Sequence, residues 1–355
     1  MISAKQAANN NLWRAAFASV TGTGHERKGI VCQDAASIKT SGNALAACVC
    51  DGAGSARLSH IGAKAVAEAV SQLLVKQRDA IFADEWSGEA VIDAAHKAIN
   101  TEIKRTGGKP KDYACTLVAL LITRDKFATF HLGDGLIAAV DEGIPKVISA
   151  PVNGEFINEV VFVTSSNAYS QLRTTISSIN PLLTSFALIT DGSQASLYSR
   201  QTNTISQVIE QMASWLDRGT VDEVSRSIES VIREHFLERT QDDCTVVVIR
   251  RNTDLQRFAC PACGRWTLRR SGRGKKNFQA KCEVCDEVKQ FPGISKRAYP
   301  PDAREWAEHL ASNMSLGLPK VRDITGIPAA TLRRWLKRRL RKKGSLRGNK
   351  RTRVR

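Results

Sequence analysis

Four short acidic stretches constrain this chain most, because each stands where a strand should end or begin. They are CQDA at Cys32–Ala35, CDGAGS at Cys50–Ser55, LITDGS at Leu188–Ser193 and QDDCTVVVI at Gln241–Ile249. Asp51 and Asp191 each follow an apolar run and precede a glycine, whereas Asp242 opens an apolar run. A fold that gathers such carboxylates must neutralise them with cations, and oxygen-only ligands favour hard ions such as Mg2+ or Mn2+. The pattern predicts a metal enzyme.

Six short motifs follow one another in a fixed order along residues 12–250. They are G-x-G-H…CQD at Gly22–Asp34, DGAGS at Asp51–Ser55, a TL strand at Cys115–Leu117, HLGDG at His131–Gly135, TDGS at Thr190–Ser193 and DDCT at Asp242–Thr245. A single DG dipeptide is more often a plain turn. Six motifs in this order resemble the metal-dependent (type 2C) protein serine/threonine phosphatases in their compact bacterial form.

The resemblance implies that two metal ions share a bridging water or hydroxide that attacks phosphorus in line. The residues it assigns to Mn2+ or Mg2+ are Asp34, Asp51, Gly52, Asp134, Asp191 and Asp242. Asp51 would bridge both ions, Asp191 and Asp242 would hold one of them, and Asp34 would act on the other. The Gly52 carbonyl would bind one ion, and Asp134 matches the position of a weaker third metal. The predicted catalytic residues are Asp34, Asp51, Asp191 and Asp242, while Asp243 is expected to cap or hydrogen-bond locally.

Three positions depart from the best-known members of that family. Their metal-binding Glu-Asp pair is Gln33–Asp34 here, a histidine that many members carry after the DG is Ala53, and a phosphate-binding arginine is Gly29. The Gln33 carbonyl can still coordinate, with weaker binding of one metal. These departures leave open an alternative, a catalytically weak or inactive phosphatase fold that serves as a DNA-binding regulator.

The loop that precedes Asp34 is basic, and its residues could replace the missing arginine. The candidates for phosphate binding are His25, Arg27 and Lys28.

Charge divides the chain into two parts of opposite character. Residues 251–355 hold 28 Lys and Arg against 8 Asp and Glu, a net charge of +20, whereas the first 250 residues hold 24 against 27, a net charge of −3. A strongly basic segment favours a polyanionic partner. No apolar run approaches the ~18 residues of a membrane helix, and the N-terminus lacks the layout of a signal peptide, so we expect a cytoplasmic protein without a membrane partner.

The nine cysteines fall into two groups. Five stand in apolar runs of the first 250 residues, and four form two CxxC pairs separated by 18 residues: Cys260, Cys263, Cys282 and Cys285. Four thiolates at this spacing can enclose one tetrahedral Zn2+, with two hairpin knuckles supplying the pairs. The alternative is a redox-active CxxC, which two pairs without a thioredoxin-like context argue against. The spacing predicts a structural zinc ribbon.

Beyond the cysteines the sequence predicts a helix at Asp302–Asn313, then Leu318–Thr325, a turn through Gly326-Ile327-Pro328, and a helix over Ala329–Lys343. Pro328 suits the start of the last helix, and the order is that of a helix-turn-helix. The residues expected at the DNA groove are Thr331, Arg333, Arg334, Lys337 and Arg338. Ribbon and helix-turn-helix together resemble the DNA-binding module of some insertion-sequence transposases, which implies double-stranded DNA as partner. A basic amphipathic helix that binds a protein or RNA is the alternative.

Hydrophobic periodicity in the first 250 residues alternates strands with two pairs of amphipathic helices. The expected helices are Leu58–Lys76, Glu89–Lys104, Ser206–Asp217 and Val221–Phe236, and the later strands include Glu159–Thr164, Pro181–Thr190 and Cys244–Arg250. The predicted fold class is α+β, a four-layer αββα phosphatase sandwich followed by a small zinc ribbon and an all-α helix-turn-helix with a basic tail. The predicted domains are 1–250 phosphatase, 251–257 linker, 258–295 ribbon, 300–343 helix-turn-helix and 344–355 disordered tail.

These observations predict a metal-dependent phosphatase that hydrolyses phosphoserine and phosphothreonine on proteins while its C-terminal part holds it on DNA. The expected cofactors are two Mn2+ or Mg2+ ions, with a weaker third, and one structural Zn2+. By analogy with similar bacterial phosphatases, a serine/threonine kinase is the expected protein partner.

Overall fold

The computed structural model describes residues 12–83, 86–151, 160–179, 182–252, 257–258, 268–273, 278–282, 285, 288–291, 311, 317–325 and 327–336. The chain divides into two compact units, Met1–Arg251 and Asn252–Arg355.

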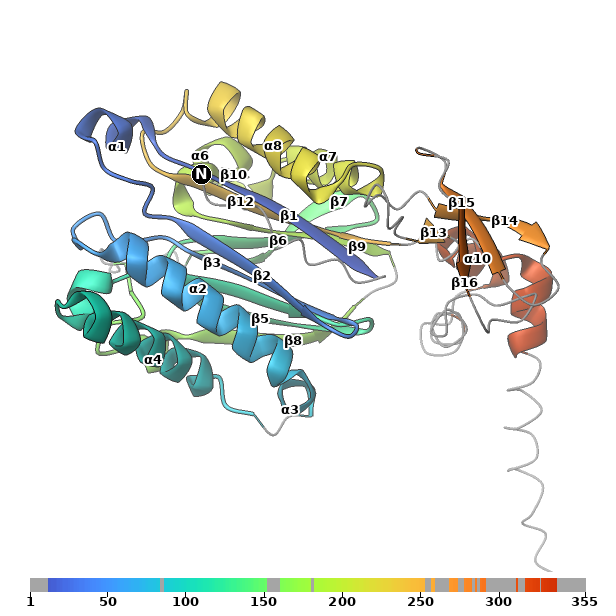
Figure 1. Ribbon diagram of the computed structural model, residues 1–355, viewed down its shortest axis with the longest axis horizontal. Coiled ribbons are helices and arrows are strands. Elements are labelled where there is room, and N and C mark those ends of the chain that lie inside the picture. The colour runs from blue at the N-terminus through green and yellow to red at the C-terminus, as the bar shows by residue number, and fades with distance from the viewer. Residues whose placement is uncertain are drawn as a thin grey trace, which may run out of the picture. The chain divides into compact units, whose positions relative to one another are not determined.

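Two antiparallel five-stranded sheets form the centre of the first unit (Figure 1). One sheet has the order β1 (Trp13–Val20), β12 (Cys244–Arg251), β9 (Leu183–Ile189), β6 (Leu136–Asp141) and β7 (Ile144–Ser149). The other has the order β2 (Ala35–Ser41), β3 (Ala44–Cys50), β4 (Leu117–Ile122), β5 (Lys126–Leu132) and β8 (Arg173–Ser178). The central strands are covered on both faces, which explains why β4 reads as an unbroken apolar run, LVALLI, rather than an alternating one.

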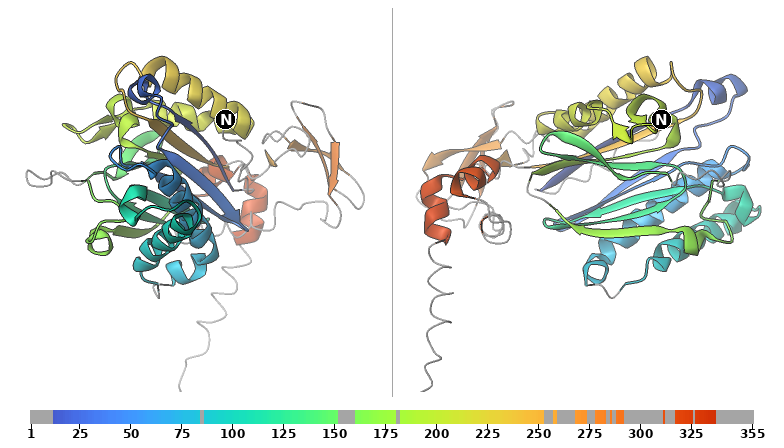
Figure 2. Two further views of the ribbon diagram at one scale, coloured as in Figure 1. Left: turned by 60° about the vertical axis from the view of Figure 1, so that its left-hand side comes forward. Right: turned by 180° about the vertical axis from the view of Figure 1, so that it is seen from behind.

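Helices cover the outer face of each sheet, as Figures 1 and 2 show from three directions. α2 (Ser59–Lys76) and α4 (Glu89–Thr106) pack on the β2–β8 sheet, and α6 (Asp191–Leu197), α7 (Val208–Ser214) and α8 (Val221–Val231) pack on the β1–β7 sheet. The short helices are α1 (Thr23–Lys28), α3 (Arg78–Phe82) and α5 (Ala168–Gln171). Single helical turns occupy Pro110–Tyr113, Trp215–Asp217 and Ile232–Phe236, and a small ribbon pairs β10 (Tyr198–Ser199) with β11 (Thr204–Ile205).

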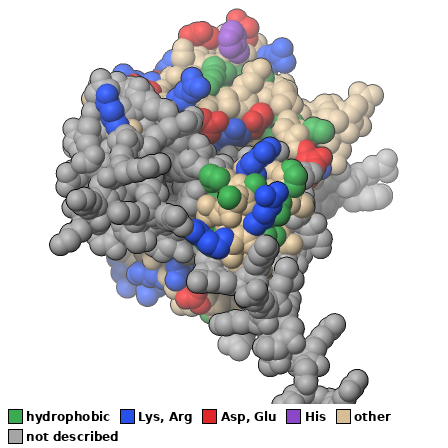
Figure 3. Space-filling model, turned by 90° about the vertical axis from the view of Figure 1, so that its right-hand side faces the viewer, with side chains coloured by type: hydrophobic (Ala, Val, Ile, Leu, Met, Phe, Trp, Pro, Cys, Tyr) green, Lys and Arg blue, Asp and Glu red, His purple; other side chains and the backbone are tan. Residues whose placement is uncertain are grey.

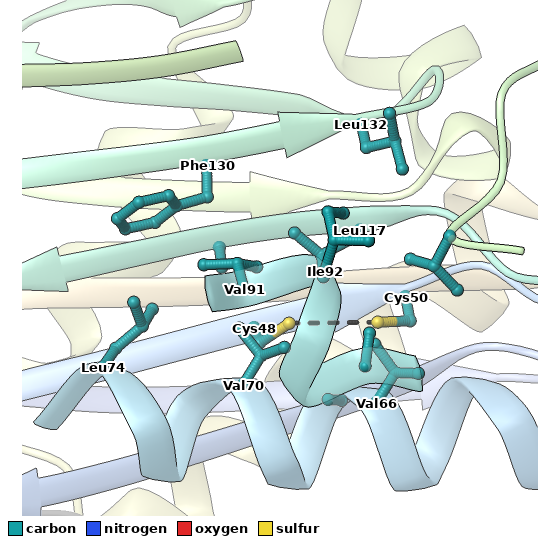
Figure 4. Packing of buried hydrophobic residues seen from close by; sticks show 14 of the residues in the cluster. Cys48, Cys50, Val66, Val70, Leu74, Val91, Ile92, Leu117, Phe130 and Leu132 are labelled. Atoms are coloured by element: carbon teal, nitrogen blue, oxygen red, sulfur yellow. Dashed lines mark hydrogen bonds between the residues drawn. The ribbon is translucent and has the colours of Figure 1, made fainter. Parts of the chain in front are cut away.

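Three apolar cores lie between the four layers. The middle core joins the two sheets and includes Phe186, whose ring contacts the rings of Trp13 and Phe127. The core under α2 and α4 contains the neighbouring thiols of Cys48 and Cys50, with sulfur atoms 3.9 Å apart (Figure 4). The described residues of this unit therefore confirm the predicted sandwich of helices, two sheets and helices.

In the first unit the predicted helices agree with α2, α4, α7 and α8, and the predicted strands Pro181–Thr190 and Cys244–Arg250 agree with β9 and β12. The predicted helix Asp302–Asn313 lies outside the described residues apart from residue 311, which is helical. Glu159–Thr164 was expected to be a strand, but the described residues 160–164 form no strand, and Val163 donates its backbone N–H to the Cys115 carbonyl instead. The strand in this region is β8, which the sequence did not predict. β8 lies at a sheet edge with most of its side chains exposed, so its sequence RTTISS carries little apolar signal.

The second unit contains a four-stranded antiparallel sheet, β13 (Arg257–Phe258), β14 (Leu268–Arg273), β15 (Phe278–Cys282) and β16 (Val288–Phe291). α10 covers Leu318–Thr325, and residues 329–336 are also helical. Val321, Ile327 and Leu332 are fully buried, as expected for residues that pack inside such a helix pair. Across the described ranges, no helix combines the length and the apolar character needed to cross a bilayer.

Candidate functional site

Three aspartates meet at the end of the sandwich. Asp51 follows β3, Asp191 begins α6 directly after β9, and Asp134 lies in the turn between β5 and β6. Each offers one carboxylate oxygen, and these three oxygens lie within 4.8 Å of one another. Because β3 and β9 belong to different sheets, only the packing of the two sheets brings these side chains together.

Burial and mutual repulsion raise the pKa values of these three carboxylates. Burial, followed by the charges of Asp34, Asp191, Asp134 and Asp242, raises the pKa of Asp51 well above its usual range. Burial, followed by the charges of Asp134 and Asp242, raises the pKa of Asp191 to about 6. Carboxylates that share one buried site raise one another's pKa values in this way, a pattern typical of functional sites.

Asp34 is the most enclosed of the predicted ligands and lies outside the group of three. The Thr190 hydroxyl donates to its Oδ2 at 2.7 Å, and the same hydroxyl oxygen accepts the Thr245 backbone N–H at 3.0 Å. Burial raises the pKa of Asp34, and the bond from Thr190 offsets part of that rise. Its Oδ1 is buried and has no hydrogen-bond partner among the described residues. One oxygen is thus fixed by threonine while the other remains available to a cation.

Asp242 and Asp243 occupy different surroundings although they are neighbours in the chain. Asp242 is exposed, and its Oδ1 accepts the Asp243 backbone N–H at 2.9 Å. Asp243 is buried and accepts the backbone N–H groups of Gly22 at 2.7 Å and Gln33 at 2.6 Å. Asp243 does form hydrogen bonds as expected, but to residues more than 200 positions away rather than locally.

Gln33 and Gly52 lie against each other beside these aspartates. A Cβ on Gly52 would stand 2.7 Å from the Gln33 carbonyl oxygen, so only glycine permits this approach. The Gln33 side-chain Oε1 is buried, and the described part of the chain gives it no hydrogen-bond partner. It is an oxygen donor that a hard cation would satisfy.

The donors of this region therefore fit a divalent cation such as Mg2+ or Mn2+. They are oxygen atoms only, three of them converge, and two buried oxygens of Asp34 and Asp134 lack partners in the described ranges. Ions of this kind prefer carboxylate and carbonyl oxygens.

The basic candidates all lie on α1, next to this centre in sequence. Arg27 donates to the Thr23 carbonyl at 3.0 Å and to the Gln241 side chain at 2.7 Å, whereas Lys28 is exposed at the end of the helix. The His25 Nδ1 lies 3.0 Å from Asp243 Oδ2. Of the three, His25 is the one in contact with a buried carboxylate of the region.

The sequence analysis missed several residues that support the aspartates. Thr190 donates a hydrogen bond to Asp34, and Gln194 donates its side-chain amide to the Asp134 backbone carbonyl. Burial raises the pKa of Asp134, and the charge of Arg200 offsets part of that rise. Thr190 adjoins a predicted ligand in the TDGS motif, so its hydroxyl was a readable signal. Arg200 lies in the turn between β10 and β11, and no motif marks it.

Ala53 directly follows Gly52. Its side chain is 8% exposed and packs with Ala56, Ala114 and Phe162 in a small apolar cluster. This position therefore offers no proton donor and no ligand.

The second unit is described in part. Cys282 ends β15 and Cys285 follows it with its side chain exposed, while Cys260 and Cys263 lie outside the described residues. Arg333 and Arg334 are exposed and Thr331 is half-buried on the helix 329–336, and Lys337 and Arg338 lie outside the described residues. Figure 3 shows Lys and Arg side chains grouped with hydrophobic ones on the face that it presents.

Comparison with known proteins gives one clear family. The family model described as protein phosphatase 2C matches residues 21–232, more than half of the chain. A curated relative, serine/threonine-protein phosphatase 3 of Escherichia coli (strain K12), is 28% identical over 170 residues, which are 46% of this chain and 67% of the relative.

Solved structures give a weaker likeness. RsbX in complex with magnesium is 16% identical at a TM-score of 0.44, over 70% of this chain and 99% of that one. Serine/threonine phosphatase Stp1 from Staphylococcus aureus is 14% identical at a TM-score of 0.48, over 69% of this chain and 96% of that one. Both TM-scores are below 0.5. The chain belongs to the protein phosphatase 2C family.

Proposed function

We propose that the chain hydrolyses phosphoserine and phosphothreonine esters on proteins with the help of Mn2+ or Mg2+. The observation that carries the proposal is the convergence of the Asp51, Asp134 and Asp191 carboxylates in a chain of this family. The named activity of the Escherichia coli relative supports serine and threonine as the esterified residues.

The metal-holding roles follow the predicted set. Asp51, in the converging group, would contact both ions, Asp191 and Asp242 would hold one of them, and the unpartnered oxygen of Asp34 would hold the other. The Gly52 carbonyl and the Gln33 amide oxygen would add neutral ligands beside Asp34, and Asp134 would hold a weaker third ion. Bound metals supply a nucleophile from water at neutral pH and neutralise charge on the phosphoryl group.

The chain's own residues orient this machinery. Thr190 holds one oxygen of Asp34, so the other oxygen keeps a fixed direction. Asp243 ties the backbone N–H groups of Gly22 and Gln33 together, which fixes the loop that carries Asp34. His25, Arg27 and Lys28 on α1 are the side chains proposed to meet the substrate phosphate.

The test is phosphate release from a phosphothreonine peptide by the full-length protein with Mn2+, with Mg2+ and with a chelator. We expect turnover only with metal, and a loss of at least about 1,000-fold in Asp51→Asn, because the bridging carboxylate contributes to both ions. Asp79→Asn removes a carboxylate that is 90% exposed and should leave the rate unchanged. Turnover that survives chelation, or that Asp51→Asn leaves intact, contradicts the proposal.

We further propose that the second unit binds one Zn2+ through Cys260, Cys263, Cys282 and Cys285 and holds the enzyme on double-stranded DNA. The CxxC spacing, the four-stranded sheet around Cys282 and the charge of +20 over residues 251–355 support this. The DNA-contacting residues would be Thr331, Arg333, Arg334, Lys337 and Arg338. A tether raises the local concentration of substrates near the bound DNA, including a partner kinase, without changing the active site.

Zinc content is the direct measurement for this unit. Metal analysis of the purified full chain should give one zinc per molecule, and Cys282→Ser should lose it. DNA binding should fall with the zinc, because the ribbon and the helices form one compact unit. Full zinc content in Cys282→Ser would overturn the ligand set.

A regulator without catalysis is the second candidate function, and Ala53 is the observation that favours it. The position offers no proton donor, and Gln33 replaces an acidic ligand. This candidate predicts metal binding and DNA binding with no phosphate release in either metal.

A further inference from the structure

Asp243 accepts contacts from three residues of one segment. Its Oδ1 accepts the Gly22 backbone N–H at 2.7 Å, its Oδ2 accepts the Gln33 backbone N–H at 2.6 Å, and His25 Nδ1 lies 3.0 Å from Oδ2. The carboxylate is 2% exposed. A buried carboxylate this close to an imidazole nitrogen restricts the orientation of the ring.

The segment that carries His25 is docked closely on the turn before β12. Gly24 donates its N–H to the Gln241 carbonyl at 2.9 Å, and the Arg27 guanidinium bonds the Gln241 side chain. A Cβ on Gly22 would stand 2.3 Å from the Asp242 backbone, so the two segments are in direct backbone contact. His25 is therefore held beside the aspartate centre and not on a free loop.

His25 is only partly enclosed. Its side chain is 17% exposed, and the contact to Asp243 uses Nδ1 only. The Nδ1–Oδ2 contact lacks the angle of an aligned hydrogen bond, a common state before substrate binds. Asp243 Oδ2 also accepts the backbone N–H of Gln33, the residue before Asp34, so this pair lies at the border of the proposed metal centre. Figure 1 shows α1 at the same end of the sandwich as the start of α2. That helix begins a few residues after Asp51 in the sequence.

We propose that His25, positioned by Asp243, gives the proton that the leaving-group oxygen needs, a role that Ala53 cannot fill. The inference rests on the proposed function. As the oxygen of the attacking water bonds to phosphorus, the bond from phosphorus to the serine or threonine oxygen breaks. That oxygen takes the proton from Nε2 of His25, the free hydroxyl side chain and inorganic phosphate leave, and solvent returns a proton to Nε2. His25 is the catalytic residue and Asp243 the positioning residue.

The charged groups around His25 come from three segments. Asp243 faces the ring from the residue before β12, and the Cys32 thiol lies beside Asp243. Burial, followed by the charges of Asp34 and Asp243, raises the pKa of the Cys32 thiol, so this thiol stays protonated. On α1 itself the charged neighbours of His25 are Glu26 and Arg27. Nη1 of Arg233 lies 3.9 Å from Oε1 of Glu26. Asp243 is the one of these that contacts the ring directly.

The experiment compares two substrates whose leaving groups differ in their need for a proton. Phosphothreonine peptide releases a poor leaving group, whereas p-nitrophenyl phosphate releases an anion that is stable near neutral pH. In full-length His25→Gln with saturating Mn2+, kcat should fall about 100-fold on the peptide and only a few-fold on the aryl ester. His235→Gln changes an exposed histidine and should leave both rates as in wild type.

Three further variants separate catalysis from folding. Added imidazole should restore peptide turnover in His25→Ala but not in Asp34→Asn, because only the first lacks a proton donor. Asp243→Asn should lower the peptide rate more than the aryl ester rate, since it acts through the same ring.

Equal losses on both substrates in His25→Gln, with no rescue by imidazole, would overturn this assignment while leaving the phosphatase proposal intact. A wild-type protein that hydrolyses neither substrate with metal would instead overturn the phosphatase proposal and this inference with it.

Discussion

Asp34, Asp242 and Asp243 show how the surroundings of a carboxylate decide its use. Each oxygen of Asp243 accepts one backbone N–H, and Oδ2 also faces His25, so both oxygens already contact the protein. Asp242 is exposed and Asp34 keeps one buried oxygen without a partner in the described ranges. The sequence DD thus places a buried, hydrogen-bonded carboxylate directly after an exposed one.

The raised pKa of Asp191 predicts how stability without metal depends on pH. Its folded pKa is about 6 against an ordinary value of 3.8, so between these values the folded chain binds more protons than the unfolded chain. The free energy of unfolding contributed by this group is therefore present at low pH and lost as pH rises through about 6. The chelated protein should melt at higher temperature near about pH 5 than near about pH 7.5.

Thermal melts of wild type and Asp191→Asn, both with chelator, isolate this effect. The difference between the two melting temperatures should change with pH, and Mn2+ should raise the melting temperature of wild type more than that of the variant. A difference that stays constant from about pH 5 to about pH 7.5 would show that Asp191 does not titrate there.

Gln33 gives a second prediction at the scale of single residues. Gln33→Glu adds a negative ligand beside Asp34, so we expect Mn2+ to bind about tenfold more tightly at one site, since ligand charge sets affinity. Without metal the same change adds repulsion and should lower the melting temperature. Calorimetric titration with Mn2+ measures the first effect, and Gln33→Leu is the matched variant that should weaken binding. Equal affinities in all three proteins would remove Gln33 from the site.

At the scale of elements, α1 and the turn before β12 behave as one unit. The Gly24 N–H bonds the Gln241 carbonyl, and the absence of a side chain at Gly22 lets the two backbones touch. This contact joins the first motif of the chain to the last and aligns the loop that carries Gln33 and Asp34.

Gly22→Ala should therefore lower the free energy of unfolding far more than a substitution of Gly29, the glycine at the other end of α1. A Cβ at Gly22 would meet backbone atoms at 2.3 Å, whereas at Gly29 nothing lies within 4 Å and only the left-handed backbone, with φ of 65°, opposes it. We expect a loss of about 2–3 kcal/mol for Gly22→Ala and about 1 kcal/mol for Gly29→Ala. Chemical denaturation measures both, and a smaller loss for Gly22→Ala would contradict the close docking.

At the scale of the whole molecule, charge is the main division. The first unit carries the acidic centre, and the second belongs to a segment with a net charge of +20. Counterion release makes the binding of such a segment to DNA strongly dependent on salt.

The full chain should bind double-stranded DNA with an affinity that falls steeply as salt rises. If Arg333, Arg334, Lys337 and Arg338 each neutralise one phosphate, the slope of log affinity against log salt is about −4. Replacing Arg333 and Arg334 with alanine should reduce that slope to about −2. Fluorescence anisotropy across a salt series measures it, and a slope that the double variant leaves unchanged would exclude these residues from the interface.

The order of acidic motifs by itself determined the family, the protein phosphatase class and the sandwich of helices and sheets, because glycine after a strand-end aspartate and long apolar runs are local signals. The sequence did not predict edge strand β8, because a strand with exposed side chains carries little apolar pattern. Only the tertiary structure decided that Asp51, Asp134 and Asp191 converge, that Thr190 holds Asp34, and that Asp243 clamps Gly22 and Gln33 while facing His25. These contacts join residues that lie up to 221 positions apart, and their geometry depends on how two sheets pack, which no local pattern encodes.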